Sequence, residues 1–128
     1  MWGKVSLWIL VVFFVMAGLW HFIDAPSYYP LIPYYLPFPK VINFVSGALE
    51  VVLGLSMLYL VWRKWAGWAL IVLMILFIPS HIHFIQQDGC VEGSLCFPVW
   101  VAWVRLILVH PLLIWWIWSS KNYQGHVV

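Results

Sequence analysis

Ionisable side chains interrupt the long apolar stretches of this sequence at a few positions, and these residues could carry chemistry. They are His21, Glu50, His81, His83, Arg105 and His110. A charged or strongly polar group in apolar surroundings is costly, so such residues usually face a partner, a ligand or a water-filled cavity. We therefore treat them as candidates for a binding or catalytic site.

Glu50 is the strongest candidate, because it belongs to a small and polar stripe. The residues that share its face of a helix, at spacings of three, four or seven, are Asn43, Ser46, Gly47 and Gly54. Small residues let two helices approach closely, and polar residues hydrogen-bond between helices. Two interpretations stay open. Glu50 is either a protonated or paired group that joins helices, or part of a ligand, metal or proton site.

The remaining candidates differ in what their positions indicate. Arg105 needs a partner, and its long side chain favours an ion pair with Glu50; it could also orient a ligand oxygen. His81 and His83 are two residues apart, so a regular helix points them to opposite sides. We expect His83 to be interfacial. His110 lies about 140° around an α-helix from Arg105, so we expect it to be a hydrogen-bonded packing residue.

Four ionisable residues from four segments are expected to converge on one outward-facing polar pocket. They are His21, Glu50, His81 and Arg105, joined by Asn43 and Ser46. Such a set could hold a quinone carbonyl or move a proton. It could also bind a metal ion, with His21, Glu50 and His81 as ligands. None of the spacings is a specific metal motif, so the cofactor stays open between a quinone and a metal ion.

Four apolar runs of 18 to 22 residues must position these side chains, at residues 5–22, 41–62, 65–85 and 99–119. A helix of about 20 residues crosses the hydrocarbon core of a bilayer. The chain is 66% hydrophobic and 8% charged, whereas a soluble domain is about a quarter charged. The sequence therefore predicts an all-α polytopic membrane protein. One four-transmembrane-helix bundle would span residues 1–128, with the lipid bilayer as its solvent.

The segments between the runs predict the orientation in the membrane. A tight turn is expected at Arg63-Lys64, and longer outer loops at residues 23–40 and 86–98. Four of the six basic residues then fall on one side: Lys4, Arg63, Lys64 and Lys121. Because basic residues are enriched in cytoplasmic segments, both termini are predicted to be cytoplasmic. The net charge of +2 includes no basic stripe, so nucleic acid is not an expected partner.

Two cysteines, Cys90 and Cys96, lie in the second predicted outer loop. An oxidising compartment on that side favours a structural disulfide between them. A redox-active pair and two free thiols are the alternatives.

Several motifs together resemble the DoxX-like family of small integral membrane proteins. The similarity runs over about Ala17–Trp118. The motifs are Ala17–Phe22, Tyr29–Pro37, Ser46–Gly54, Pro79–Ile82 and Trp103–Leu106. The resemblance implies a four-helix, multi-pass protein of the bacterial inner membrane, in contexts that include a thiosulfate:quinone oxidoreductase. Carried over residue by residue, its motif positions are His21, Glu50, His81 and Arg105.

Three functions are compatible with these observations. The first, which we favour, is an accessory membrane protein whose pocket binds quinone, lipid or a partner redox protein, with no reaction of its own. The second is a membrane enzyme or redox carrier that uses Glu50 and the histidines. The third is an assembly factor or chaperone for exported or membrane proteins. Expected partners are a membrane or periplasmic redox protein and further copies of the chain.

Overall fold

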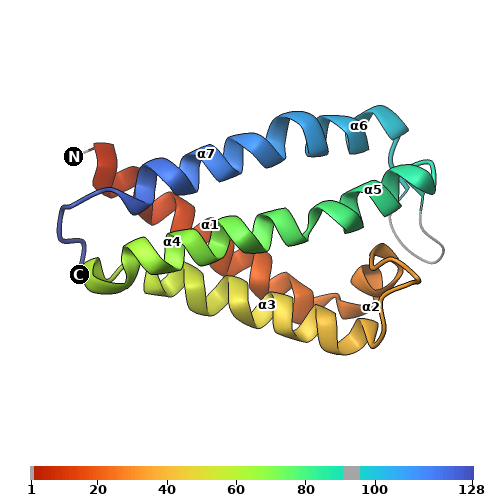
Figure 1. Cartoon of the computed structure of the whole chain (residues 1–128), viewed down its shortest axis with the longest axis horizontal. Coiled ribbons are helices and arrows are strands. Elements are labelled where there is room, and N and C mark those ends of the chain that lie inside the picture. The colour runs from red at the N-terminus through yellow and green to blue at the C-terminus, as the bar shows by residue number, and fades with distance from the viewer. Residues whose placement is uncertain (1, 91–95) are drawn as a thin grey trace.

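The computed structural model describes residues 2–90 and 96–128, and these ranges are helical apart from short connections (Figure 1). Four helical segments are long and apolar enough to cross a membrane: Trp2–Ile23, Pro39–Ser56, Leu60–Gln86 and Val99–Lys121. They contain 22, 18, 27 and 23 residues, close to the roughly 20 that a bilayer requires. The predictions of an all-α fold and of four such segments are therefore confirmed.

The first two segments are the single helices α1, Trp2–Ile23, and α3, Pro39–Ser56. The other two are interrupted. The third consists of α4, Leu60–Leu76, and α5, Ile78–Gln86, with Pro79 near the break. The fourth consists of α6, Val99–Val104, the π-helix η2, Arg105–Val109, and α7, His110–Lys121. Both interruptions are close to a proline, which lacks the N–H of a regular helix and crowds the preceding turn.

The turn between α3 and α4 does not lie at Arg63-Lys64 as predicted. It lies at residues 57–59, and Arg63 and Lys64 belong to the first turn of α4. The residues of the turn and its neighbours are apolar, so hydropathy could not locate it. Arg63 is 1% exposed, and its guanidinium donates hydrogen bonds to the carbonyls of Met57 and Leu58 in the turn. Arg63, which was expected to lie in the turn, instead stabilises it through these hydrogen bonds.

The predicted loop at residues 23–40 contains two short helical turns, α2 (Ala25–Tyr28) and the 3₁₀-helix η1 (Tyr29–Leu31). This loop contains five prolines, a residue that is disfavoured in the interior of a helix. Three of them instead stand at the start of helices: Pro26 in α2, Pro30 in η1 and Pro39 in α3. A proline is tolerated there, because the first N–H groups of a helix have no partner within it.

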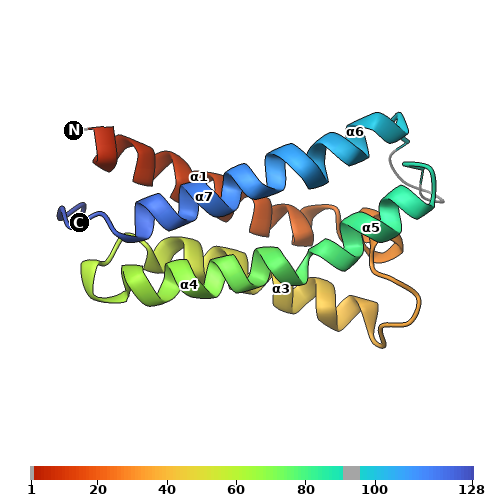
Figure 2. The ribbon, with the colours of Figure 1, turned by 45° about the horizontal axis from the view of Figure 1, so that its top comes forward.

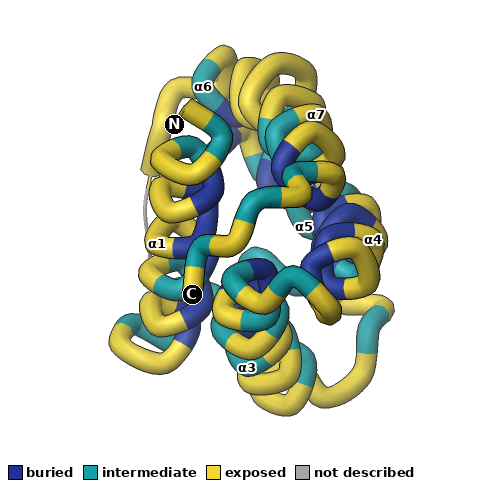
Figure 3. Tube along the Cα trace, turned by 90° about the vertical axis from the view of Figure 1, so that its left-hand side faces the viewer, coloured by how far each residue is buried: buried dark blue, intermediate teal, exposed yellow. Residues whose placement is uncertain are grey.

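The helices associate as two pairs. The first helix pair is α1 with α3, and the second is α4–α5 with α6–η2–α7. Both termini lie at one end of the bundle, which we call the terminal end, and there the pairs pack together (Figures 1 and 3). The buried core of this half includes Leu10, Phe14, Leu70, Met74 and Ile117. Towards the opposite end the two pairs diverge, as two views show (Figures 1 and 2).

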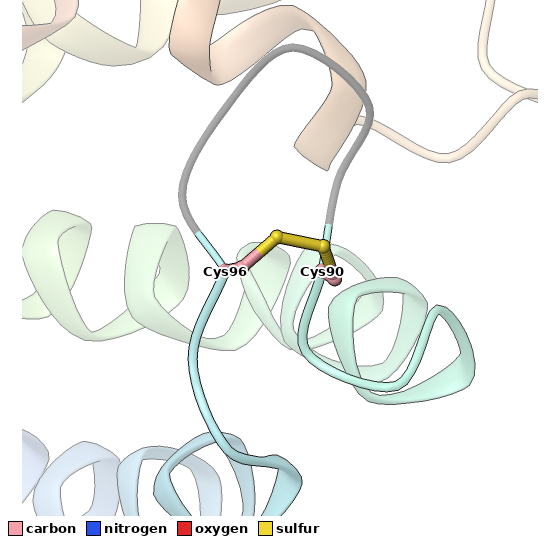
Figure 4. Close-up of a disulfide and its surroundings, with 2 residues drawn as sticks. All are labelled: Cys90 and Cys96. Atoms are coloured by element: carbon pink, nitrogen blue, oxygen red, sulfur yellow. A yellow bond between two sulfur atoms is a disulfide. The ribbon is translucent and has the colours of Figure 1, made fainter.

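The opposite end, which we call the disulfide end, carries Cys90 and Cys96. These cysteines are joined between α5 and α6 (Figure 4), so the predicted pairing is confirmed. Beside them the Phe97 amide donates to the carbonyl of Gly89 at 2.9 Å. Residues 91–95 of the predicted loop lie outside the described residues.

Two glycines set the close crossing of α1 and α3. A Cβ added to Gly47 would lie 2.6 Å from Cβ of His21 and 2.8 Å from the carbonyl oxygen of Gly18. A Cβ on Gly18 would lie 2.6 Å from the carbonyl oxygen of Gly47. Contacts this short are not tolerated, so any side chain here would separate the helices. The small stripe seen in the sequence therefore brings the His21 backbone directly against α3.

Candidate functional site

A cavity of about 670 Å³ fills the space where the two helix pairs diverge. Its volume lies within the range of about 300–1,000 Å³ that is usual for small-molecule sites. The six residues that the sequence singled out for a pocket all line it: His21, Asn43, Ser46, Glu50, His81 and Arg105. Three polar lining residues were not predicted: Tyr28, Ser80 and His110. Most of the remaining wall is aliphatic or aromatic.

His21 is held against α3 by two hydrogen bonds to Asn43. The Asn43 amide nitrogen donates to the backbone carbonyl of His21 at 2.8 Å, and Nδ1 of His21 lies 2.7 Å from Oδ1 of Asn43. A carbonyl oxygen can only accept, so the first bond fixes which way the amide points. Oδ1 is therefore an acceptor, and Nδ1 of His21 must carry the hydrogen.

The other ring nitrogen of His21 faces Glu50. Nε2 lies 3.4 Å from Oε2 of Glu50, and Glu50 is only 4% exposed. Because Nδ1 already carries a hydrogen, a neutral imidazole would present a lone pair at Nε2 to the carboxyl oxygen. Two lone pairs in such apolar surroundings repel, so the pair retains one further proton, either on the imidazole or on the carboxyl. His21 and Glu50 therefore form a proton-holding pair.

Apart from His21, no described residue offers Oε2 of Glu50 a hydrogen-bond partner, although this oxygen is fully buried. Buried polar atoms almost always have a partner, so Oε2 depends on the proton that it shares with His21. The sequence hypothesis that Arg105 pairs with Glu50 is not supported, because His21 is the ion-pair partner of Glu50 in the described part of the chain. Arg105 reaches the cavity wall from η2 and remains exposed.

Tyr28 adds an aromatic and a hydrogen-bonding group next to the proton-holding pair. Its ring stacks on His21, with ring centroids 4.0 Å apart and planes inclined by 26°. Burial raises the pKa of the Tyr28 phenol, and the nearby Glu50 carboxyl raises this pKa further. The phenol is therefore a neutral donor at physiological pH. The sequence placed Tyr28 in the outer loop at residues 23–40, and nothing in its local pattern indicated that it lines a cavity.

The second helix pair contributes His81, His110 and Arg105 to the opposite wall. The rings of His81 and His110 meet edge to face, with centroids 4.8 Å apart. Nε2 of His110 hydrogen-bonds the carbonyl of Met74, near the break between α4 and α5. Since that oxygen only accepts, Nε2 of His110 carries a hydrogen. His110 thus donates a hydrogen bond to a carbonyl near the break between α4 and α5.

His110 is buried and hydrogen-bonded, as expected of a packing residue, and the π-helix explains why it also lines the cavity. In an α-helix the five residues from Arg105 to His110 turn about 140°, which would place them on different faces. The amide of His110 instead donates to the carbonyl of Arg105, five residues back, so the turn is wider and both residues line the cavity. Pro111 supplies a reason, since its ring crowds the preceding turn. π-Helical turns of this kind are frequent at functional sites.

His83 points away from the cavity, as the two-residue spacing from His81 predicted. It was expected to be interfacial, and within the bundle it is 8% exposed. Its Nε2 lies 2.7 Å from Nε2 of Gln87, one turn later in the chain. The ring of Tyr34 lies near His83, with centroids 6.4 Å apart, and the sequence did not indicate this neighbour.

The described residues do not assemble a metal site. Among them, no group of three His, Cys, Asp or Glu side chains is placed to hold a metal ion. The set His21, Glu50 and His81 therefore lines one cavity without forming a ligand cluster. What the arrangement offers is a proton-holding pair on one wall, donors on the other, and an apolar volume between them.

Fold and cavity together define an all-helical protein with four potential membrane spans and a polar-walled cavity in one half of its bundle. Comparison with protein families matches residues 10–121 to the family described as "Domain of unknown function (DUF8561)". The match covers most of the chain, which therefore belongs to this family. Searches of the curated proteins and of the solved structures gave no match.

Proposed function

We propose that this protein is an accessory integral membrane protein of the DoxX-like type, and that its cavity binds a quinone. In this proposal the chain lies in the bacterial inner membrane and presents the ligand to a membrane or periplasmic redox partner. The observation that carries the proposal is the buried carboxyl of Glu50, which lines the cavity and whose Oε2 has His21 as its one polar partner in the described chain. A ligand hydroxyl or carbonyl would complete this site.

The chemistry of the wall supports a quinone more than a plain lipid. A quinone ring is flat and apolar and carries two carbonyl oxygens, which accept hydrogen bonds. Tyr28 and Arg105 are donors at the wall, and the His21–Glu50 pair can either donate its proton or accept one from the hydroxyl of a quinol. Phe14, Phe77 and other apolar residues supply surfaces against which a ring can pack.

Exchanging Glu50 for glutamine tests this function, because the amide keeps the shape of the carboxyl and removes its acidic proton. Native mass spectra of the protein released from lipid nanodiscs would be recorded with a decyl-tailed para-quinone. We expect the wild type to retain one quinone. We expect Glu50→Gln to bind it about tenfold or more weakly, because a hydrogen bond to a charged group contributes roughly 1.5–3 kcal/mol.

Asp88→Asn is the matched control, since Asp88 is an exposed acid that does not line the cavity. This variant should retain the quinone like the wild type. Equal retention by the wild type and Glu50→Gln would contradict the proposed site. Absence of retained quinone in the wild type would contradict the ligand class.

The proposed orientation places the terminal end in the cytoplasm. Lys4, Arg63, Lys64 and Lys121 all lie in helices that begin or finish at that end, and basic residues are enriched on the cytoplasmic side. The joined cysteines at the disulfide end suit the oxidising periplasm. A green fluorescent protein fused after Val128 should therefore fluoresce, and alkaline phosphatase fused there should stay inactive. The reverse pattern would overturn the orientation.

A further inference from the structure

The cavity wall contains a row of residues that face both the cavity and the outside of the bundle. Val41, Val45 and Leu49 recur every four residues along α3, line the cavity, and are 58%, 46% and 40% exposed. Leu76, at the end of α4, also lines the cavity and is 65% exposed. These four apolar side chains therefore form a rim rather than a closed wall.

The backbone arrangement explains why the rim stays open. In the described residues α3 makes no close backbone contact with α5, although it contacts α4 towards the terminal end. Towards the disulfide end, η1 contacts both α3 and α5 and closes the gap at that end. Figures 1 and 2 show α3 and α5 diverging between these two limits. The result is an opening in the side of the bundle, which we call the window. It is bounded by η1 towards the disulfide end and by the α3–α4 contact towards the terminal end.

The window lies within segments that are long and apolar enough to cross a membrane. Its rim is made of valine and leucine. Water and charged solutes find no hydrogen-bond partner there, whereas an alkyl chain moves from lipid to equally apolar surroundings at no cost in free energy. The polar groups lie deeper, at His21, Glu50 and His81. A molecule that entered here would lead with its polar head and leave its tail between α3 and α5.

A second gap, between α1 and η2, is less suited to this role. These two elements also lack close backbone contact in the described chain. The exposed residues that line the cavity there are Phe13, Val109 and Arg105, which are a ring, one small side chain and a cation. The Phe13 ring is set edge to face against Phe14, with centroids 5.3 Å apart, which fixes it across this side. The rim of the gap between α3 and α5 is longer, and its side chains are smaller than the Phe13 ring.

We infer that the window between α3 and α5 is a lateral portal, through which a ligand with a long apolar tail enters from the bilayer and in which its tail remains. The inference rests on the proposed function and specifies its ligand as membrane-dissolved and tailed. The tail needs no pocket of its own, because lipid and the portal rim are equally apolar. Recognition is then confined to the head, at the polar walls of the cavity.

Photochemical labelling tests the portal by location. A para-quinone with a diazirine at the end of a decyl tail would be added to the protein in nanodiscs, irradiated, and the labelled positions mapped by mass spectrometry. We expect labelling at Val41, Val45, Leu49 and Leu76, and an excess of unlabelled quinone should prevent it. Labelling that this competitor prevents is called removable labelling. Labelling that persists in excess unlabelled quinone comes from probe dissolved in the surrounding lipid, and it serves as background.

Val45→Trp should narrow the portal and abolish most of the removable labelling. Val52→Trp is the matched control, because Val52 is exposed on the same helix but does not line the cavity; it should label like the wild type. Removable labelling at Phe13 and Val109, or anywhere else, would overturn the portal while leaving quinone binding intact. Quinone retained in native spectra with no removable tail labelling would also overturn it. No retained quinone at all would instead refute the proposed function.

Discussion

Replacing Arg63 with methionine is expected to lower the free energy of unfolding by roughly 3 kcal/mol or more, since each hydrogen bond from a charged donor contributes about 1.5–3 kcal/mol. Besides the carbonyls of Met57 and Leu58, the guanidinium donates to those of Tyr123 and Gly125, at 2.7 and 2.9 Å. One buried side chain thus ties the α3–α4 turn to the segment that follows α7. Methionine fills a similar volume but satisfies none of these four acceptors.

Titration of the purified protein with sodium dodecyl sulfate in mixed micelles would measure this loss. Lys64→Met is the matched control, since Lys64 is the exposed neighbour of Arg63 in the same helical turn. The control should unfold at nearly the wild-type detergent fraction. If both variants unfolded alike, the guanidinium would not be the element that secures the turn.

Replacing Gly47 with leucine is expected to have the second large effect. Even a Cβ at this position would press on His21 and on the backbone of Gly18, both closer than 3 Å. Leucine is the better helix former by about 1 kcal/mol, but overpacking a tight contact costs typically 1–3 kcal/mol for a few extra methylenes and more where backbones collide. The collision outweighs the gain, so we expect α1 and α3 to separate.

The same detergent titration would show this as an early unfolding transition, together with lost quinone retention because His21 would move away from Asn43. Ala48→Leu is the control, because it introduces the same side chain at the next position, which is half-buried and does not line the cavity. A Gly47→Leu variant that unfolded like Ala48→Leu would show that the α1–α3 crossing is not set by the glycines.

The number and approximate location of the helices could be predicted because they depend on local composition. Long apolar runs have one solution in a bilayer, and the four that the sequence contains all became helices. The end of α3 could not be placed, since the turn at residues 57–59 is as apolar as the helices beside it. Only the tertiary contacts of Arg63 distinguish that turn, and those involve residues about 60 positions away.

The cavity was predictable in part for the same reason. Buried ionisable residues are rare enough that their presence indicated a common site, and His21, Glu50, His81 and Arg105 do share one cavity. Their pairing was not predictable. Glu50 faces His21 rather than Arg105, because the glycine crossing brings α1 against α3. His110 was missed because the phase of a helix changes at a π-turn, which no periodicity argument anticipates.

The division of the bundle into a packed half and a hollow half bears on how such proteins diversify. The side chains of the core, such as Leu10 and Leu70, lie towards the terminal end, whereas the cavity lies where the helix pairs part. Substitutions at sites that share no partners usually add in their effects on stability. Cavity residues that do not contact this core can therefore change, and so accommodate new ligands, while the packed half preserves the fold; Phe14 and Met74 belong to both and are held in place by the core.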